Sequence, residues 1–277
     1  MRGLAFSVRA SSVLASTLAL LGACGTPAEK RDPPVAFAKL SPDRVKHGER
    51  LAIVLGCSGC HGKDLAGQDW SEDGYGRLWT ANLTVAAAGY SDAQLESVIR
   101  SGKKPDGTPL WDMPSNLFTQ LADADMAALI AYIRSRPAKG AAHPPPTFGP
   151  ILKAEMAKGT YYSSAVKVER EGKAWPPDAG PQHRLARYMV RATCAECHEM
   201  NLRGGKSGPV KAERPDIRIA ASYESGDFAR LLRTGVPAGE RKLGLMGEVA
   251  RGRYSHFTDA EIAAIHAYLK AVAERDP

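Results

Sequence analysis

The chain is short of the residues that build large sheets. Only 7% of its 277 residues are aromatic, whereas it has 27 glycines and 19 prolines. Glycine and proline interrupt helices and strands and favour turns. A chain of this length has room for one large domain or two small ones. The composition therefore favours small, loop-rich units over one large sheet.

Long hydrophobic runs are also missing. A membrane-spanning helix needs roughly 18 or more apolar residues, and the longest run, ASSVLASTLALLGA, is shorter and follows two arginines and no acidic residue. This is the plan of an export signal, so residues 1–23 are predicted to be a signal peptide. The run ends in LLGAC, which resembles a bacterial lipoprotein signal. Cys24 is then the expected lipid-bearing residue, on a tether over residues 24–40; an ordinary cleaved signal is the alternative.

No cluster of basic residues marks the chain as a nucleic-acid binder. Residues 41–138 carry 10 basic and 12 acidic groups, and residues 181–277 carry 16 and 12. Such uneven charge bears on docking and solubility rather than on fold. The arginines are scattered, and an exported protein does not meet nucleic acid, so no nucleic-acid partner is expected.

Cysteine is scarce too. Besides Cys24 the chain has four, in two copies of Cys-x-x-Cys-His. The motif residues are Cys57, Cys60 and His61 in CSGCH, and Cys194, Cys197 and His198 in CAECH. Two thiols at this spacing attach the two vinyl groups of a haem, and the next histidine binds its iron. Zinc would need the pairs about 15–20 residues apart, whereas these lie 137 apart, and a redox dithiol would explain neither histidine. The sequence therefore predicts two covalently bound haems c.

Two such motifs in an exported chain resemble the class I c-type cytochromes, specifically exported proteins with two of these domains in tandem. The resemblance covers most of residues 41–277. It implies an all-α fold in which each half is a small helical bundle around one haem. The expected organisation is a first cytochrome c domain over 41–137, a Pro-rich linker over 138–180 and a second domain over 181–277. The resemblance also implies a methionine ligand about 50–60 residues beyond each motif.

The two halves of the chain align with each other. RLAIVLGCSGCHGKDLAG matches RYMVRATCAECHEMNLRG at an offset of 137, LESVIRSG matches FARLLRTG at 133, and ADADMAALIAYI matches TDAEIAAIHAYL at 136. Three blocks in one order indicate a duplicated domain. The offset of 133 also places Met113 on Met246, 52 and 48 residues after the haem histidines. Repeat and resemblance together predict that these methionines bind the two irons; packing is the alternative.

The other methionines fit this role less well. Met200 is two residues from His198, and so short a chain cannot pass round the haem to its other face. Met126 falls on a helical core stripe, and Met189 lies in the apolar segment before the second motif. Met156, in the linker, stays open as an alternative ligand.

Local signals predict the helices of both halves. In the first half an entry helix precedes Cys57, a second begins at a capping box formed by Ser91 and Gln94, and a last one spans residues 123–134. Gly102 predicts the end of the second helix.

The second half repeats this plan. Thr258 and Glu261 form a capping box, and Gly235 predicts a helix end. His266 is expected to be buried with a hydrogen-bond partner. Pro209 is one candidate for the carbonyl group that orients His198, and a turn proline is the other interpretation.

A histidine and a methionine on each iron leave no position for a substrate, and they raise the reduction potential relative to two histidines. The expected function is therefore electron transfer, as a carrier or as a subunit of an oxidoreductase complex, rather than catalysis. The expected partners are an exported dehydrogenase or a membrane complex as donor, and another cytochrome or a terminal oxidase as acceptor. The expected location is the bacterial periplasm, with a lipid anchor in the inner or the outer membrane.

The alternative is a dihaem enzyme with one open or unusually ligated iron, such as a peroxidase or a sulfur-compound dehydrogenase. Thiosulfate-oxidising relatives use a cysteine ligand at one haem, but this chain has no cysteine to spare beyond Cys24. A closed iron in both halves argues against this alternative.

Overall fold

The structure is a computed structural model that describes residues 35–205 and 214–275. The predicted signal peptide, Cys24, most of the predicted tether and Pro209 lie outside the described residues. Within the described part of the chain, no helix is long and apolar enough to cross a membrane.

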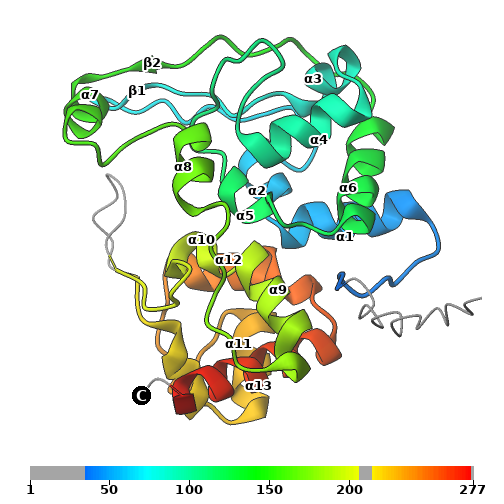
Figure 1. The fold of residues 1–277 in the computed structure, drawn as a ribbon, viewed down its shortest axis with the longest axis vertical. Coiled ribbons are helices and arrows are strands. Elements are labelled where there is room, and N and C mark those ends of the chain that lie inside the picture. The colour runs from blue at the N-terminus through cyan, green and yellow to red at the C-terminus, as the bar shows by residue number, and fades with distance from the viewer. Residues whose placement is uncertain (1–34, 206–213, 276–277) are drawn as a thin grey trace, which may run out of the picture. The chain divides into compact units, whose positions relative to one another are not determined.

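The described residues fold mainly into helices, with one short antiparallel ribbon, so the predicted all-α class is confirmed (Figure 1). The first half contains α1 (Arg44–Val54), α2 (Cys57–His61), β1 (Gly76–Arg77), α3 (Leu83–Gly89), α4 (Asp92–Ser101), α5 (Ser115–Phe118) and α6 (Asp123–Ser135). The next segment contains β2 (Thr147–Phe148), α7 (Pro150–Ala157) and α8 (Ser164–Glu171). The second half contains η1 (Pro181–His183), α9 (Arg184–Ala192), α10 (Ala195–His198), η2 (Ile217–Ser222), α11 (Ser225–Thr234), α12 (Leu245–Gly252), η3 (Tyr254–His256) and α13 (Asp259–Arg275).

The predicted helix boundaries are confirmed in atomic detail. Ser91 and Gln94 exchange backbone-to-side-chain hydrogen bonds at the start of α4, and Gly102 ends that helix with a φ of 66°. Thr258 and Glu261 exchange the same two bonds at the start of α13. These caps satisfy N–H groups that a helix leaves without partners at its first turn. Local sequence therefore sets where the main helices begin and end.

The duplication is visible in long-range contacts as well as in sequence. Arg100, on α4, donates to the carbonyl oxygen of Leu121 at 2.8 Å and to Asp123 Oδ1 at 3.1 Å. Its repeat partner Arg233, on α11, makes the same pair of bonds to the carbonyl of Phe257 and to Asp259. In each half one arginine therefore ties the middle helix to the start of the last helix.

The Pro-rich segment over residues 138–180 packs on both halves. Its strand β2 pairs with β1, where Gly76 lies opposite Phe148. Farther along, the backbone N–H of Ser164 donates to the carbonyl of Leu110 at 2.9 Å in the first half. The carbonyl of Ala174 accepts from Arg191 Nε of the second half at 3.1 Å. The segment therefore covers the first half and then crosses to the second.

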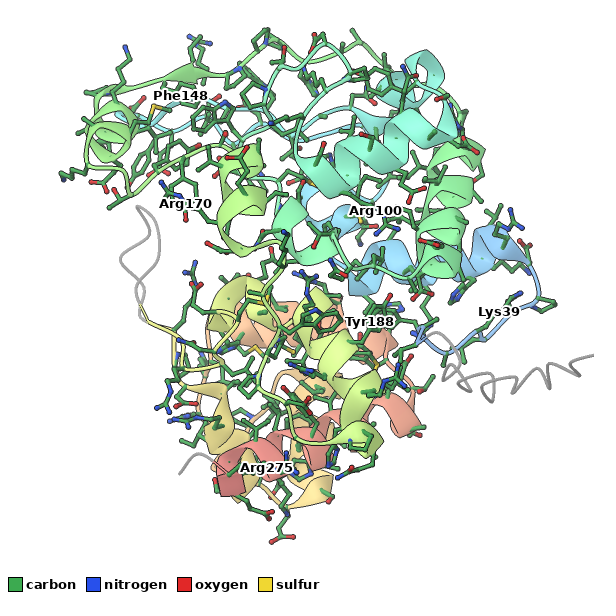
Figure 2. All side chains as sticks on the ribbon, viewed as in Figure 1. Lys39, Arg100, Phe148, Arg170, Tyr188 and Arg275 are labelled. Carbon is green, nitrogen blue, oxygen red and sulfur yellow. The ribbon has the colours of Figure 1, made fainter. Side chains whose placement is uncertain are left out.

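Charged and polar side chains buried at the junction join the two halves. Arg50 Nη2 donates to Glu261 Oε1 at 2.7 Å, with 10% and 2% of the two side chains exposed. Tyr188, labelled in Figure 2, donates to Asp125 Oδ2 at 2.7 Å. The repeat pairs Asp125 with Glu261, so the same position of each last helix is bonded by a residue of the other half's entry helix.

Arg191 fills a second part of the junction. It is 1% exposed and donates from Nη2 to the carbonyls of Asn116 and Gly172, each at 2.9 Å. Its Nη1 also donates to the carbonyl of Leu117. A buried guanidinium is tolerated only when its N–H groups find acceptors. Arg191 therefore ties α9 to α5 and to the linker at one point.

The buried Arg50–Glu261 pair gives a stability prediction. Arg50→Met leaves the Glu261 carboxylate buried without its cation, and breaking such a pair from one side costs roughly 3–5 kcal/mol. Denaturant unfolding of the holoprotein should show a loss of this size. The double variant R50M/E261Q should recover part of it, because no unpaired charge then remains.

The matched control is the exposed pair of Lys103 and Glu169, whose side chains are 48% and 67% exposed at an N–O distance of 3.6 Å. Lys103→Met should cost about 0–1 kcal/mol. Equal losses for R50M and K103M would show that the pair at the junction carries no special weight.

Candidate functional site

The first Cys-x-x-Cys-His motif forms the short helix α2, which presents its two thiols and its imidazole on one turn. Gly56 precedes it with a φ of 86° and Gly62 follows with a φ of 81°, so left-handed backbone brackets the motif. The His61 side chain is buried, and its Nδ1 lies 2.7 Å from the carbonyl oxygen of Ala81. Because a carbonyl only accepts, Nδ1 carries the proton.

A loop folds back over His61 to deliver this carbonyl. The N–H of Gly67 donates to the carbonyl of His61 at 2.8 Å, and the N–H of Leu83 donates to that of Leu65 at 2.9 Å. Gly67 has a φ of 85°, and a Cβ there would lie 2.5 Å from the oxygen of Thr80. Only glycine fits this close approach of two backbone segments.

The second motif repeats this geometry. His198, at the end of α10, is buried, and its Nδ1 lies 2.8 Å from the carbonyl oxygen of Pro215. The N–H of Ile217 donates to the carbonyl of Leu202 at 3.0 Å, as Leu83 does to Leu65. The sequence offered Pro209 as one candidate for the orienting carbonyl, and Pro209 lies outside the described residues. Among the described residues, Pro215 supplies this carbonyl.

Burial keeps both motif histidines in the form that can bind a metal. Burial lowers the pKa of both His61 and His198, so each ring stays neutral near pH 7. With Nδ1 donating its proton, the lone pair of Nε2 is available to a metal. The bond to the carbonyl fixes this tautomer and the orientation of the ring.

The sulfur atoms fit thioethers better than metal thiolates. Burial raises the pKa of Cys57 to about 12 and that of Cys60 to about 11, and none of the four motif cysteines forms a disulfide. Burial therefore favours the uncharged thiols when no metal is bound. In the described ranges no group of three or more His, Cys, Asp and Glu residues could hold a metal ion, whereas haem brings four nitrogen ligands of its own.

The two predicted methionine ligands differ in their surroundings. Met113 packs against the core in the loop before α5. The preceding residue, Asp112, has a φ of 58° and accepts a 2.8 Å hydrogen bond from the hydroxyl of Tyr161 in the linker. Met246 also packs against the core, but it lies in the first turn of α12 beside Leu245, whose side chain is 64% exposed.

The competing residues lie where their patterns indicated. Met126 and Met189 are fully buried in the core. His266 is buried, with its Nε2 3.1 Å from the carbonyl of Ala220 and its ring stacked on Phe228 at 4.6 Å. His266 is therefore satisfied by protein groups.

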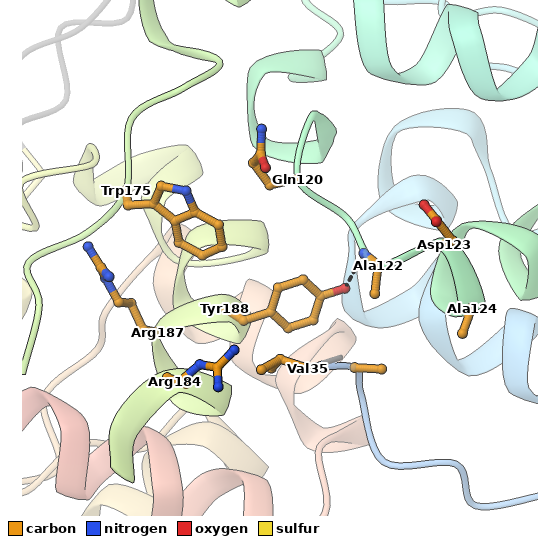
Figure 3. A pocket seen from close by; sticks show the side chains of 10 residues that line it. Val35, Gln120, Ala122, Asp123, Ala124, Trp175, Arg184, Arg187 and Tyr188 are labelled. Atoms are coloured by element: carbon orange, nitrogen blue, oxygen red, sulfur yellow. Dashed lines mark hydrogen bonds between the residues drawn. The ribbon is translucent and has the colours of Figure 1, made fainter. Parts of the chain in front are cut away.

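One pocket of the described residues lies away from both motifs. It has a volume of about 550 Å³ and lies at the junction, where Tyr188 reaches toward Ala122 and Trp175 stands beside Arg187 (Figure 3). None of the predicted haem residues lines it. This cavity therefore reflects the joining of the two halves rather than the cofactor site.

Comparison with known proteins identifies the family. The family model described as cytochrome c matches residues 45–137 and again residues 184–273, about two thirds of the chain. The chain belongs to the cytochrome c family. Cytochrome c domains hold covalently bound haem c and transfer electrons, which accounts for the pairs of thiols and the buried histidines.

Similar curated proteins are cytochrome subunits of dehydrogenases. The chain is 27% identical to the fructose dehydrogenase cytochrome subunit of Gluconobacter japonicus, over 95% of this chain and 59% of that protein. It is 24% identical to the gluconate 2-dehydrogenase cytochrome c subunit of Pantoea cypripedii, over 87% and 64%. It is also 24% identical to the alcohol dehydrogenase (quinone) cytochrome c subunit of Gluconacetobacter polyoxogenes, over 84% and 57%. The chain thus spans about three fifths of the length of these relatives.

The sequence analysis missed several groups of the site. The carbonyl groups of Ala81 and Pro215 act through the backbone, so their residue types carry no signal. Tyr161 lies 48 residues beyond Met113 in the chain, and only the folded linker brings its hydroxyl to Asp112. The repeat could have located the carbonyls, because they follow their histidines by 20 and 17 residues in the sequence.

The loop over His61 gives a second prediction. Gly67→Ala forces a side chain into left-handed backbone, which costs roughly 1–2 kcal/mol, and adds the clash with the Thr80 carbonyl. We expect the free energy of unfolding of the holoprotein, measured with denaturant, to fall by more than this amount. The control is Gly59→Ala, because Gly59 lies in the same motif but a Cβ there meets nothing within 4 Å. A variant G67A as stable as G59A would contradict the role of the loop.

Proposed function

We propose that this protein is a dihaem electron-transfer subunit that takes electrons from an exported dehydrogenase and passes them to another cytochrome or a terminal oxidase. One observation carries the proposal. Two buried histidines, each held through Nδ1 by a backbone carbonyl, follow two pairs of free thiols in one folded unit. This arrangement suits two cofactors that are held at fixed positions and exchange electrons.

The residues have the following proposed roles. Cys57 and Cys60 would attach the first haem, with His61 and Met113 as axial ligands; Cys194 and Cys197 would attach the second, with His198 and Met246 as axial ligands. Each haem supplies one-electron chemistry at its iron. The chain keeps each histidine neutral and holds its ring through a backbone carbonyl, so that Nε2 is available to the iron.

The proposed donor rests on the relatives. Three of them are named as cytochrome subunits of fructose, gluconate and alcohol dehydrogenases. We take from this the class of donor, an exported dehydrogenase of small hydroxylated substrates, and not any one substrate. The proposed location is the periplasm, with Cys24 as a lipid anchor that raises the local concentration of the protein near membrane partners.

The methionine ligands give the decisive experiment. The native protein should carry two covalent haems by mass, titrate in two redox waves and fail to bind carbon monoxide when reduced. Met113→Ala and Met246→Ala should each open one iron, so that one haem per chain binds carbon monoxide and the potential of that haem falls. Absorbance spectra during a redox titration measure both effects.

Met200→Ala is the matched control, because Met200 lies beside the second motif but is not expected to reach the iron. It should leave both waves and the lack of carbon monoxide binding unchanged. If the native reduced protein already binds carbon monoxide at one haem, an open-iron enzyme replaces the electron-transfer proposal.

The lipid anchor can be tested separately. Cys24→Ala should move the protein from the membrane fraction to the soluble periplasmic fraction of the cells that express it, with both haems still attached. Loss of labelled fatty acid from the protein would accompany this shift. A native protein that is already soluble after export would favour an ordinary cleaved signal.

A further inference from the structure

Arg253 occupies an unusual place between the two haem motifs. It directly follows α12, and 14% of its side chain is exposed. Its Nη1 donates to Glu196 Oε2 at 2.7 Å, and its Nε donates to the carbonyl oxygen of Val54 at 3.3 Å. The guanidinium therefore bonds one residue of each half.

Both bonded residues belong to haem-attachment segments. Glu196 is the second variable residue of CAECH, between Cys194 and Cys197. Val54 ends α1, three residues before Cys57. Figure 1 shows α10 and α12 of the second half on the side where α2 and α5 of the first half lie. One side chain therefore bridges the two segments that the proposed function assigns to the two haems.

Gly56 makes this approach possible. A Cβ on Gly56 would lie 2.6 Å from the central carbon of the Arg253 guanidinium, so the cation rests directly on the backbone beside Cys57. The Nη2 of Arg253 is buried and has no hydrogen-bond partner among the described residues. The ion pair of Arg253 and Glu196 is mostly buried, with 14% and 26% of the two side chains exposed, so water screens both charges poorly.

We infer that Arg253 and Glu196 form a charge bridge that positions the two haem-attachment segments and sets the reduction potentials of both haems together. The inference rests on the proposed function, since it requires a haem at each motif. With a haem at each motif, the step that the bridge serves would move one electron from the reduced haem of one half to the oxidised haem of the other. No covalent bond forms or breaks and no proton moves.

The sign of the effect follows from electrostatics. Oxidation adds one positive charge to a haem, so a nearby cation disfavours the oxidised state and raises the potential, and a nearby anion lowers it. Because Arg253 and Glu196 lie between the motifs, each charge acts on both haems. Arg191 differs, since it bonds backbone carbonyls of α5 and the linker and not a haem motif.

The test is a redox titration of the holoprotein carrying charge-neutralising substitutions. Glu196→Gln leaves Arg253 unopposed and should raise both potentials. Arg253→Gln leaves Glu196 unopposed and should lower both. The double variant R253Q/E196Q should return both toward the native values. R253K keeps the charge, so it should shift the potentials less than R253Q, while it loses one of the two bonds and slows electron exchange between the haems.

The controls are Arg251→Gln and Glu248→Gln, on the same helix α12. Both side chains are exposed, so water and salt screen their charges. They should shift the potentials less than the substitutions at the bridge.

Two outcomes would overturn the inference. Shifts of R253Q and E196Q in the same direction would show a purely structural role, and a shift confined to one wave would show that the charges serve one haem only. If R253Q does not fold, E196Q still decides, because it changes charge and hardly changes shape. The mass of the native protein tests the proposed function separately, because fewer than two covalent haems would refute that function directly. The mass of each variant then shows whether both haems are still attached when the potentials are compared.

Discussion

The structure depends on guanidinium groups buried where its two halves meet. Arg50 reaches from the first half to Glu261, and Arg191 reaches from the second half to the carbonyls of Asn116 and Leu117. Removing a guanidinium from water costs several kcal/mol unless acceptors replace the water, and here the acceptors come from the opposite half. Separating the halves would leave these groups to water and expose the apolar core around them. The halves are therefore one unit, although each has the plan of a complete domain.

The junction has an approximate twofold character that explains how a duplicated domain can pair with itself. The offset of 137 places Arg191 on Val54, and the offset of 136, extended back from the last block, places Arg253 on Leu117. Arg191 donates to the carbonyl of Leu117, and Arg253 donates to the carbonyl of Val54. The end of the entry helix in one half thus meets the same segment of the other half twice, as in a symmetric dimer interface. In both contacts the arginine belongs to the second half, but it occupies a different repeat position each time. The two contacts therefore share their location in the repeat, although the first half has Val54 and Leu117 where the second half has Arg191 and Arg253.

The fold class, the motif residues and the main helix boundaries could be predicted from the sequence. The contacts across the junction could not, because they join residues that are far apart in the chain. The motifs, the repeat and the capping boxes at Ser91 and Thr258 are local patterns, so they translate directly into structure. Arg253 gave no such signal, because its importance comes from contacts with Val54, 199 residues away, and with Glu196. The linker was expected from its prolines, yet it also contains α7 and α8, whose short helices become stable only by packing on the first half.

The same junction bears on how a membrane anchor would act. The segment just after residue 34 lies between the halves: the N–H of Phe37 donates to Asp125 Oδ2 and that of Ala38 donates to Glu261 Oε1, each at 3.0 Å. These acceptors are the repeat-equivalent acids of the two last helices. In the proposed lipoprotein, the segment just after residue 34 is therefore bonded to both halves rather than to the first alone. Electron transfer between fixed cofactors depends on their separation, and bonds from one segment to both halves help to keep the halves in one arrangement.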